Sequence, residues 1–246
     1  MVALSESRLP TPESVCSAYV KSFPSAGKLS VDAAATDGDL LTLRTPTCSF
    51  AIALVRGAIP ASELSGPCAA AWYWPEAADT LKQHRGHLLI TASSSSSDAI
   101  ELMLALTRVV ASVAQSAPAL GIFLAGAKQV HKVEDFVSEA EGATRELLPL
   151  YLWIRFTLSE QGDGTTTLYT TGLADLELME VEFPRAQLDP QTLMDRAFNI
   201  AHYLLDHGAV LENGHTIGIS ADEKFKVVHA PSLNDPERLV YQLKQS

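Results

Sequence analysis

The sequence predicts an α+β protein in which mixed, mainly antiparallel sheets are covered by amphipathic helices. Residues 150–158 alternate apolar with other side chains at a period of two, which indicates a strand with one buried face. Residues 189–207 repeat apolar positions at helical spacing, between Asp189, which can cap the helix, and Gly208, which can end it. Both halves of the chain share a coarse order of strand, helix and strand, which suggests two related α/β halves.

The domain organisation follows from composition and from these signals. Residues 1–28 are rich in serine and proline and are predicted to form an N-terminal extension. Residues 29–246 are predicted to form one α+β domain, with sub-halves at 29–142 and 143–246.

In the first half, the pattern predicts strands at 29–34, 40–45, 48–56, 86–92 and 120–125, and helices at 12–22, 75–84, 98–117 and 130–140. Residues 61–71 can be helical or irregular, because Gly66-Pro67 interrupts them. Residues 48–56 are almost all apolar, which is typical of a strand buried on both faces. The serine run Ser93–Ser97 fits a loop that ends in a helix cap at Ser97 or Asp98. A phosphorylation or phosphate-binding role is the alternative for that run.

In the second half, a turn at 161–164 predicts a hairpin between 150–158 and 165–171. The alternation within 176–183 changes phase in the middle, and a β-bulge at Leu178-Met179 would bring both apolar sets inward. Beyond the helix at 189–207, the pattern predicts a hairpin of 215–220 with 224–229 and a final strand at 239–243.

Composition limits the function classes. A formal net charge of −11 over 246 residues argues against nucleic-acid binding and would suit a basic partner. The three cysteines are too few and too scattered to predict a zinc site or a disulfide framework. No signal-peptide pattern and no apolar run of about 20 residues is visible, so we expect a cytoplasmic location without membrane contact.

Four acids, Asp175, Glu177, Glu180 and Glu182, follow one another closely without an intervening basic residue. The bulge would direct Glu177, Glu180 and Glu182 to solvent. The run can be a solvated face, a patch that contacts a partner, or a pair of carboxylates for general acid–base catalysis. We expect these four residues to form the partner-binding site, and we assign no catalytic residue.

Histidines offer a second candidate site. His202 and Asp206 are four apart on one helical face, and His207, His215 and His229 follow on nearby elements. Such a set can bind a metal ion, but histidines packed against the backbone explain it as well. We expect no bound metal and no cofactor, since no four-ligand spacing and no GxGxxG, P-loop, GxSxG or HExxH motif is present. The aromatic run Trp72–Trp74 can belong to the core or to an interface.

Eight short segments together resemble a bacterial family of unknown function, DUF4261. They are Ala71–Pro75, His87–Ile90, Leu150–Phe156, Thr170–Leu173, Glu180–Glu182, Asn199–Gly208, Asn213–Gly218 and Val227–His229. The resemblance extends from about Phe50 to the C-terminus. It implies a bacterial, mostly stand-alone domain without an established catalytic set. Genes of such domains sometimes lie near secretion systems, and that analogy suggests neutralisation of a toxin.

Two functional hypotheses follow. The first is a non-catalytic protein-binding module with an acidic surface, whose sharpest form is an immunity protein against a basic secreted toxin. The second is a hydrolase-like or metal-assisted enzyme that uses His202, Asp206, Glu180 or Glu182. An enzyme requires these groups to converge in a pocket, whereas a binding module requires exposed ones.

Overall fold

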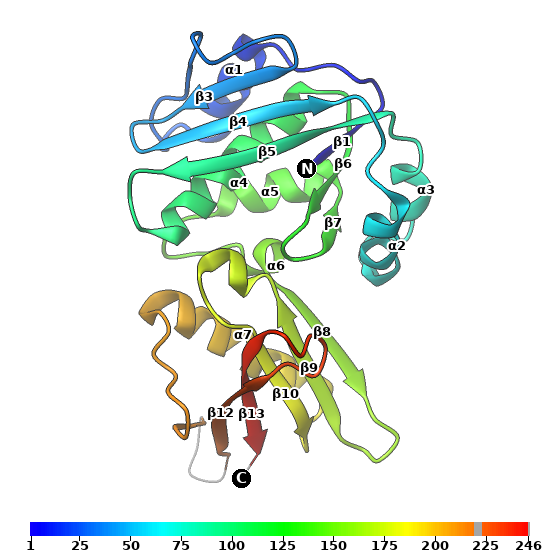
Figure 1. Cartoon of the computed structure of the whole chain (residues 1–246), viewed down its shortest axis with the longest axis vertical. Helices are drawn as coiled ribbons and strands as arrows, with labels where there is room; N and C mark the ends of the chain where they lie inside the picture. Colours follow the sequence, from blue (N-terminus) through cyan, green and yellow to red (C-terminus); the bar gives the residue numbers. More distant parts are fainter. Residues whose placement is uncertain (219–222, 246) are drawn as a thin grey trace. The chain divides into compact units, whose positions relative to one another are not determined.

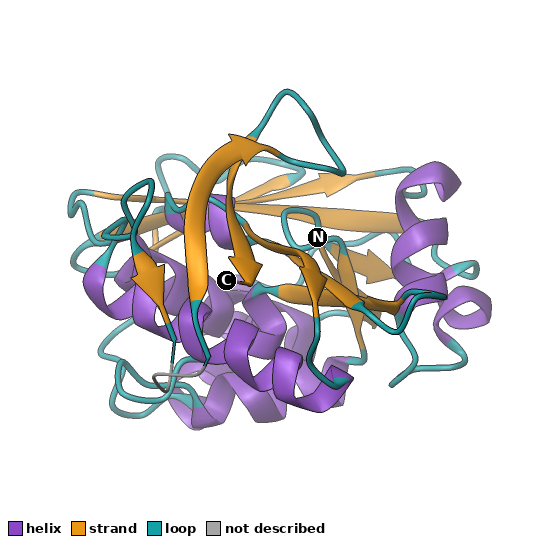
Figure 2. Cartoon of the chain, turned by 90° about the horizontal axis from the view of Figure 1, so that it is seen from below, coloured by secondary structure: helices purple, strands orange, loops and turns teal. Residues whose placement is uncertain are grey.

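The computed structural model describes residues 1–218 and 223–245 and separates the chain into two compact units, Met1–Leu152 and Trp153–Ser246. Figure 1 follows the chain through both units, and Figure 2 distinguishes their helices, strands and loops by colour. Each unit has its own sheet, as expected of an α+β protein. The division differs from the predicted single domain over 29–246, and it falls after Leu152 rather than after residue 142.

The first unit is built on a seven-stranded antiparallel sheet in the order β2-β3-β4-β5-β1-β6-β7. Its strands are β1 (Val2–Leu4), β2 (Ser30–Val31), β3 (Leu40–Arg44), β4 (Cys48–Val55), β5 (Gly86–Ser94), β6 (Ala119–Leu124) and β7 (Gln129–His131). The chain start is therefore not the separate extension that serine and proline content predicted. The fully buried β1 pairs with β5 on one side and β6 on the other.

The helices of the first unit are α1 (Pro12–Ser22), α2 (Ala61–Ala70), α3 (Ala77–Leu81), α4 (Ala99–Ser116), α5 (Val133–Gly142) and α6 (Leu150–Trp153), which crosses the boundary by one residue. Helix α4 packs against α1, α5 and the sheet. Its predicted cap is confirmed, because the Asp98 carboxylate accepts hydrogen bonds from the amides of Ile100 (3.0 Å) and Glu101 (3.1 Å). Helix α4 is long and apolar enough to cross a membrane by length and composition alone, and half of its apolar window is buried inside the protein.

Strand β4 corrects the prediction of a strand buried on both faces. Its buried residues alternate, at Cys48, Phe50, Ile52 and Leu54, while Ser49 and Val55 are exposed. Helices α1, α4 and α5 lie along one face of this sheet (Figure 1). A nearly continuous apolar run therefore does not by itself indicate a strand that is buried on both faces.

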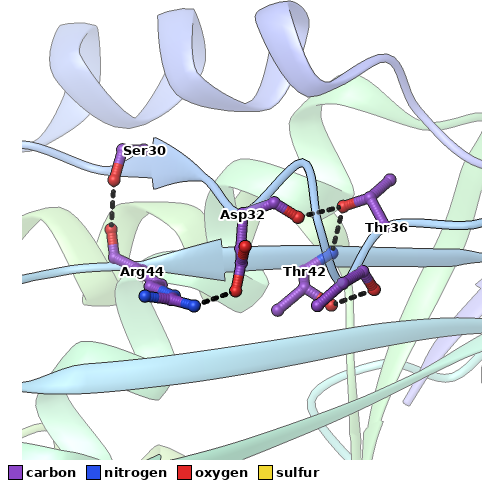
Figure 3. A network of polar contacts seen from close by, with 6 residues as sticks. Ser30, Asp32, Thr36, Thr42 and Arg44 are labelled. Atoms are coloured by element: carbon purple, nitrogen blue, oxygen red, sulfur yellow. Dashed lines mark hydrogen bonds and ion pairs between the residues drawn. The ribbon is translucent and has the colours of Figure 1, made fainter.

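Polar contacts hold the loop between β2 and β3 (Figure 3). The Asp32 carboxylate pairs with the Arg44 guanidinium. The Thr36 hydroxyl donates to the Asp32 carbonyl (2.9 Å) and accepts from the Thr42 amide (3.1 Å), and the Ser30 hydroxyl donates to the Arg44 carbonyl (3.3 Å). These bonds satisfy local backbone groups, which explains how two short predicted strands form an ordered sheet edge.

The second unit is built on a six-stranded sheet in the order β11-β12-β13-β10-β9-β8. Its strands are β8 (Arg155–Glu160), β9 (Thr166–Thr171), β10 (Val181–Ala186), β11 (Thr216–Ile217), β12 (Phe225–Pro231) and β13 (Leu239–Gln245). Strands β10 and β13 are parallel and the other pairs are antiparallel. The predicted hairpin of β8 with β9 is confirmed. Part of the predicted strand at 215–220 lies outside the described residues.

Helix α7 (Pro190–His207) packs against β8, β9 and β10, as the apolar stripe predicted. Asp189 caps it by accepting from the Thr192 amide (3.0 Å). At the other end, Gly208 has φ +78°, and its amide donates to the Leu204 carbonyl (2.7 Å). The positive φ favours glycine at this position, so the local sequence determines where the helix ends.

Two predictions are wrong, one at the boundary between the units and one within the second unit. Residues 150–153 form α6 rather than the start of a strand, and the Gln129 side chain donates to the carbonyls of Tyr151 (3.3 Å) and Leu152 (3.4 Å). Pro149 precedes this turn and its fixed φ suits the start of a helix. The phase change near 178 arises from a 3₁₀-helix, η1 (Leu173–Leu176), followed by Glu177 in a left-handed conformation with φ +61°, and not from a β-bulge.

Candidate functional site

The four predicted partner-binding acids separate into two exposed and two internal residues. Asp175 lies on η1 and Glu177 directly follows it, and both are exposed. Glu180 is half-buried and Glu182 is buried. The expectation that Glu177, Glu180 and Glu182 all face solvent is therefore wrong for Glu182, and Glu180 is only partly accessible.

Glu180 holds the turn that leads into η1. One of its carboxylate oxygens accepts from the amides of Gly172 (2.8 Å) and Ala174 (3.2 Å). The other accepts from the Thr170 hydroxyl (2.6 Å). A carboxylate that accepts three hydrogen bonds fixes the chain that donates them. Glu180 therefore fixes the position of the turn at the start of η1.

Glu182 holds a second loop, which connects β12 to β13. Its carboxylate accepts from the Ser232 hydroxyl (2.5 Å), the Leu233 amide (3.2 Å) and the Asn234 side-chain amide (3.4 Å). The Ser232 hydroxyl oxygen in turn accepts from the amides of Asn234 (3.0 Å) and Asp235 (3.2 Å). The loop is therefore tied to β10 through one buried side chain.

The position of Glu182 on β10 explains its burial. Its neighbours Val181 and Phe183 are also fully buried, so both faces of the strand are covered. Strand alternation places Glu182 on the face opposite these neighbours, where the β12–β13 loop supplies its donors. Those donors lie 50 to 52 residues further along the chain, which is why no local pattern could reveal them.

The two held segments form one continuous end of the sheet, because β10 and β13 are parallel neighbours with Val181 opposite Tyr241. We define the loop surface as seven of the exposed side chains at this end: Asp175, Glu177, Leu233, Asp235, Glu237, Arg238 and Leu239. Leu233 is 67% exposed and Leu239 is 60% exposed. These two leucines therefore give the loop surface exposed apolar area.

The loop surface has a negative balance, with four carboxylates and one guanidinium. Arg238 pairs with Asp235 at 3.1 Å. Desolvation of its carboxyl group raises the pKa of Asp175, and the charge of Arg238 opposes that shift. Asp175 is exposed as a residue although its carboxyl group is partly shielded. The influence of Arg238 on Asp175 shows that η1 and the β12–β13 loop are electrostatic neighbours.

The histidines do not converge. His202 and Asp206 pair with each other at 3.0 Å on α7, and His215 pairs with Glu212 at 3.2 Å. The remaining candidates contact backbone atoms, His207 at Tyr203 and His229 at Leu211. Two further histidines also contact the backbone, His84 at Ile59 and His87 at Gly57. Within residues 1–218 and 223–245, no group of three His, Cys, Asp or Glu side chains has the geometry of a metal site.

The aromatic run Trp72–Trp74 divides between the two interpretations. Trp74 is buried in the core of the first unit, where a Cβ atom on Gly121 would lie 2.7 Å from its ring. Trp72 is 86% exposed. The core interpretation therefore holds for Trp74 only.

His131 is a buried residue that the sequence did not single out. It is stacked against Tyr73 and contacts the edge of Phe136, with ring centroids 5.9 Å apart in each case. Its Nε2 atom is buried without a hydrogen-bond partner among the described residues. Burial disfavours the imidazolium and lowers the pKa of His131 from 6.5 to about 4.

We expect this histidine to make the protein less stable in mild acid. Below about pH 6.5 the unfolded chain protonates His131, whereas the folded protein keeps it neutral down to about pH 4, so folding becomes less favourable as the pH falls through this window. Between pH 7 and pH 5 the loss is about 2 kcal/mol. Urea unfolding at both pH values, compared with His131→Phe, isolates the effect because the variant has no imidazole. An equal pH dependence in both proteins would contradict the assignment.

Comparison with known proteins gives one match. A family model described as a domain of unknown function, DUF4261, matches residues 169–244. The matched part contains η1, β10, α7 and the loop surface, whereas the resembling segments before residue 169 lie outside it. No curated protein and no solved structure matches the chain. The similarity of this chain to the DUF4261 family therefore rests on residues 169–244, which make up most of its second unit.

Proposed function

We propose that this protein is a non-catalytic protein-binding module and that the loop surface contacts a basic partner protein. The observation that carries the proposal is that the four predicted partner-binding acids have two different roles. Glu180 and Glu182 hold η1 and the β12–β13 loop, and the loop surface that these segments present includes two leucines, four carboxylates and one guanidinium.

Preorganisation supports a binding role. A loop that is already ordered loses little conformational entropy on association, so more of the contact energy contributes to affinity. Leu233 and Leu239 offer apolar contact area, and the surrounding charges form a polar rim, which is the usual composition of an interface.

Charge indicates the kind of partner. The loop surface has four carboxylates and one guanidinium, and the whole chain has a net charge of −11. The negative charge of the loop surface and that of the whole chain both attract a basic protein and increase its association rate. The sharpest form of the proposal is a cytoplasmic bacterial immunity protein that neutralises a basic secreted toxin, and the supporting argument is the gene-neighbourhood analogy of the family.

The alternative function, a hydrolase-like or metal-assisted enzyme, would need His202, Asp206, Glu180 and Glu182 as reacting groups. In the described part of the chain, Glu180 and Glu182 already accept hydrogen bonds from two loops, and His202 pairs with Asp206. These contacts favour the binding proposal, because the carboxylates of Glu180 and Glu182 hold η1 and the β12–β13 loop in place.

The test uses the product of the neighbouring gene, co-expressed with this protein and then measured by surface plasmon resonance. We expect the double variant Asp175→Lys/Glu177→Lys to lower the association rate constant about tenfold at low salt, because steering by complementary charge changes association rates by factors of this order or more. The rate constant of the unmodified protein should fall steeply as salt is added.

Glu139→Lys/Glu146→Lys is the matched control, because it makes the same change in net charge at two exposed acids of the first unit. An equal fall in both double variants would show that net charge alone governs association. An unchanged rate in the Asp175/Glu177 variant would remove these residues from the interface.

A further inference from the structure

The second unit has a depression at the end of its sheet opposite the loop surface. It has a volume of about 260 Å³ and is lined by Glu160, Gln161, Gly164, Thr165, Thr166, Gln187, Leu188, Asp189 and Pro190. Strand β10 runs from Glu182, beside the loop surface, to Ala186, beside this depression. The volume is below the range of about 300–1,000 Å³ typical of drug-sized ligands, so it suits one side chain or a fragment.

The floor of the depression is fixed. Thr165 and Thr166 are buried, and their hydroxyls donate to the Asp163 carboxylate (2.6 Å) and the Leu188 carbonyl (3.1 Å). The Gln187 amide donates to the Gln245 side chain at 2.7 Å. The site is therefore held by contacts from β9, β13 and the β10–α7 connection.

The rim has oxygen atoms available for a donor. Among the described residues, the Glu160 carboxylate and the Gln187 side chain make no hydrogen bond or ion pair that involves their oxygens. Asp189 uses one oxygen to cap α7, and hydrogen bonds from Thr192 hold its pKa below the usual value, so it is charged. Two carboxylates and one amide oxygen thus border the cavity, beside the apolar Leu188 and Pro190.

We propose that this depression binds the guanidinium group of an arginine side chain. A guanidinium has five N–H donors in a planar fork, which suits several separate acceptors better than a compact ammonium does. The methylene stem of arginine would lie along Leu188 and Pro190. The N-terminus of α7 contributes about half a positive charge nearby, and the two carboxylates outweigh it. The proposal does not depend on the proposed function, because it concerns other residues at the opposite end of the sheet.

The test is a nuclear magnetic resonance titration of the ¹⁵N-labelled full chain with N-acetyl-arginine amide. We expect saturable shifts of the Thr165, Thr166 and Gln187 amides with a Kd on the order of 1 mM, as is usual for a ligand of this size. N-acetyl-citrulline amide has the same shape without the charge and should give no saturable shift. N-acetyl-lysine amide should bind several-fold more weakly.

Variants test whether the arginine compound binds in the depression. We expect Glu160→Gln combined with Asp189→Asn to weaken binding about tenfold, because it removes both charges while asparagine still caps α7. Glu212→Gln, an exposed acid of the same unit outside the depression, should leave the Kd unchanged. In the titration, the proposal is overturned by absent or non-saturable shifts, by shifts confined to other residues, or by equal binding of the citrulline or lysine compound. Full affinity in the double variant would also overturn it. Any of these results leaves the loop surface and its proposed partner untouched.

Discussion

Replacement of Glu182 with alanine is expected to lower the free energy of unfolding by about 2–4 kcal/mol. Glu182 is 3% exposed, and its carboxylate accepts hydrogen bonds from Ser232, Leu233 and Asn234. Its removal leaves these donors without their acceptor, and each buried unsatisfied group costs about 1–3 kcal/mol. Water can reach the exposed Leu233 and Asn234, so the total is less than three full penalties.

Two measurements distinguish the loss of the hydrogen bonds to Glu182 from a simple loss of packing. Urea unfolding gives the stability, and hydrogen exchange of the Leu233 amide reports the bond to Glu182 directly. Glu182→Gln keeps one acceptor oxygen and should lie between the unmodified protein and the alanine variant in both measurements. Glu177→Gln, at an exposed site, should change stability by less than about 0.5 kcal/mol. Unchanged exchange at Leu233 in Glu182→Ala would mean that another contact holds the loop.

The consequence for binding is specific. If Glu182 keeps the loop surface ordered, Glu182→Gln should increase the dissociation rate of the partner complex even where the protein remains folded. The reason is that a less ordered loop loses more entropy on association. Charge reversal at Asp175 and Glu177 should instead change the association rate. The two kinds of variant therefore report on loop order and on charge separately.

Replacement of Leu204 with alanine is expected to cost about 2–5 kcal/mol. Leu204 is fully buried on the face of α7 that packs against β8, β9 and β10. The loss combines the lost burial of the side chain with the cavity left behind, because the surrounding core relaxes only in part. Urea unfolding measures the cost, and an unchanged dependence on urea concentration would show that the unfolded state is the same.

Leu233→Ala is the matched control for Leu204→Ala. It makes the same chemical change in the same unit at a side chain that is 67% exposed, so we expect a change within about 0.5 kcal/mol. A loss below 0.5 kcal/mol for Leu204→Ala as well would contradict the packing of α7 on the sheet. A large loss for Leu233→Ala would instead show that the loop surface is part of the core.

The sequence by itself determined the elements whose signals are local. Helix α7 has its cap at Asp189 and its end at Gly208, and α4 has its cap at Asp98, because each of these bonds joins residues within four positions of one another. The β8–β9 hairpin is determined in the same way by a short turn between two alternating segments. The α+β class follows from these elements.

Only the tertiary structure decided the features that depend on distant residues. Residues 2–4 read as part of a polar extension, yet β1 lies inside a sheet because β5 and β6 pair with it from more than 80 positions away. Glu182 reads as a solvated acid, yet the loop after β12 covers it and donates to it. Strand alternation specifies which side chains share a face, but the segment that covers that face comes from elsewhere in the chain. For that reason the sequence identified Asp175, Glu177, Glu180 and Glu182 as one set. The fold separated the exposed Asp175 and Glu177 from Glu180, which holds η1, and Glu182, which holds the β12–β13 loop.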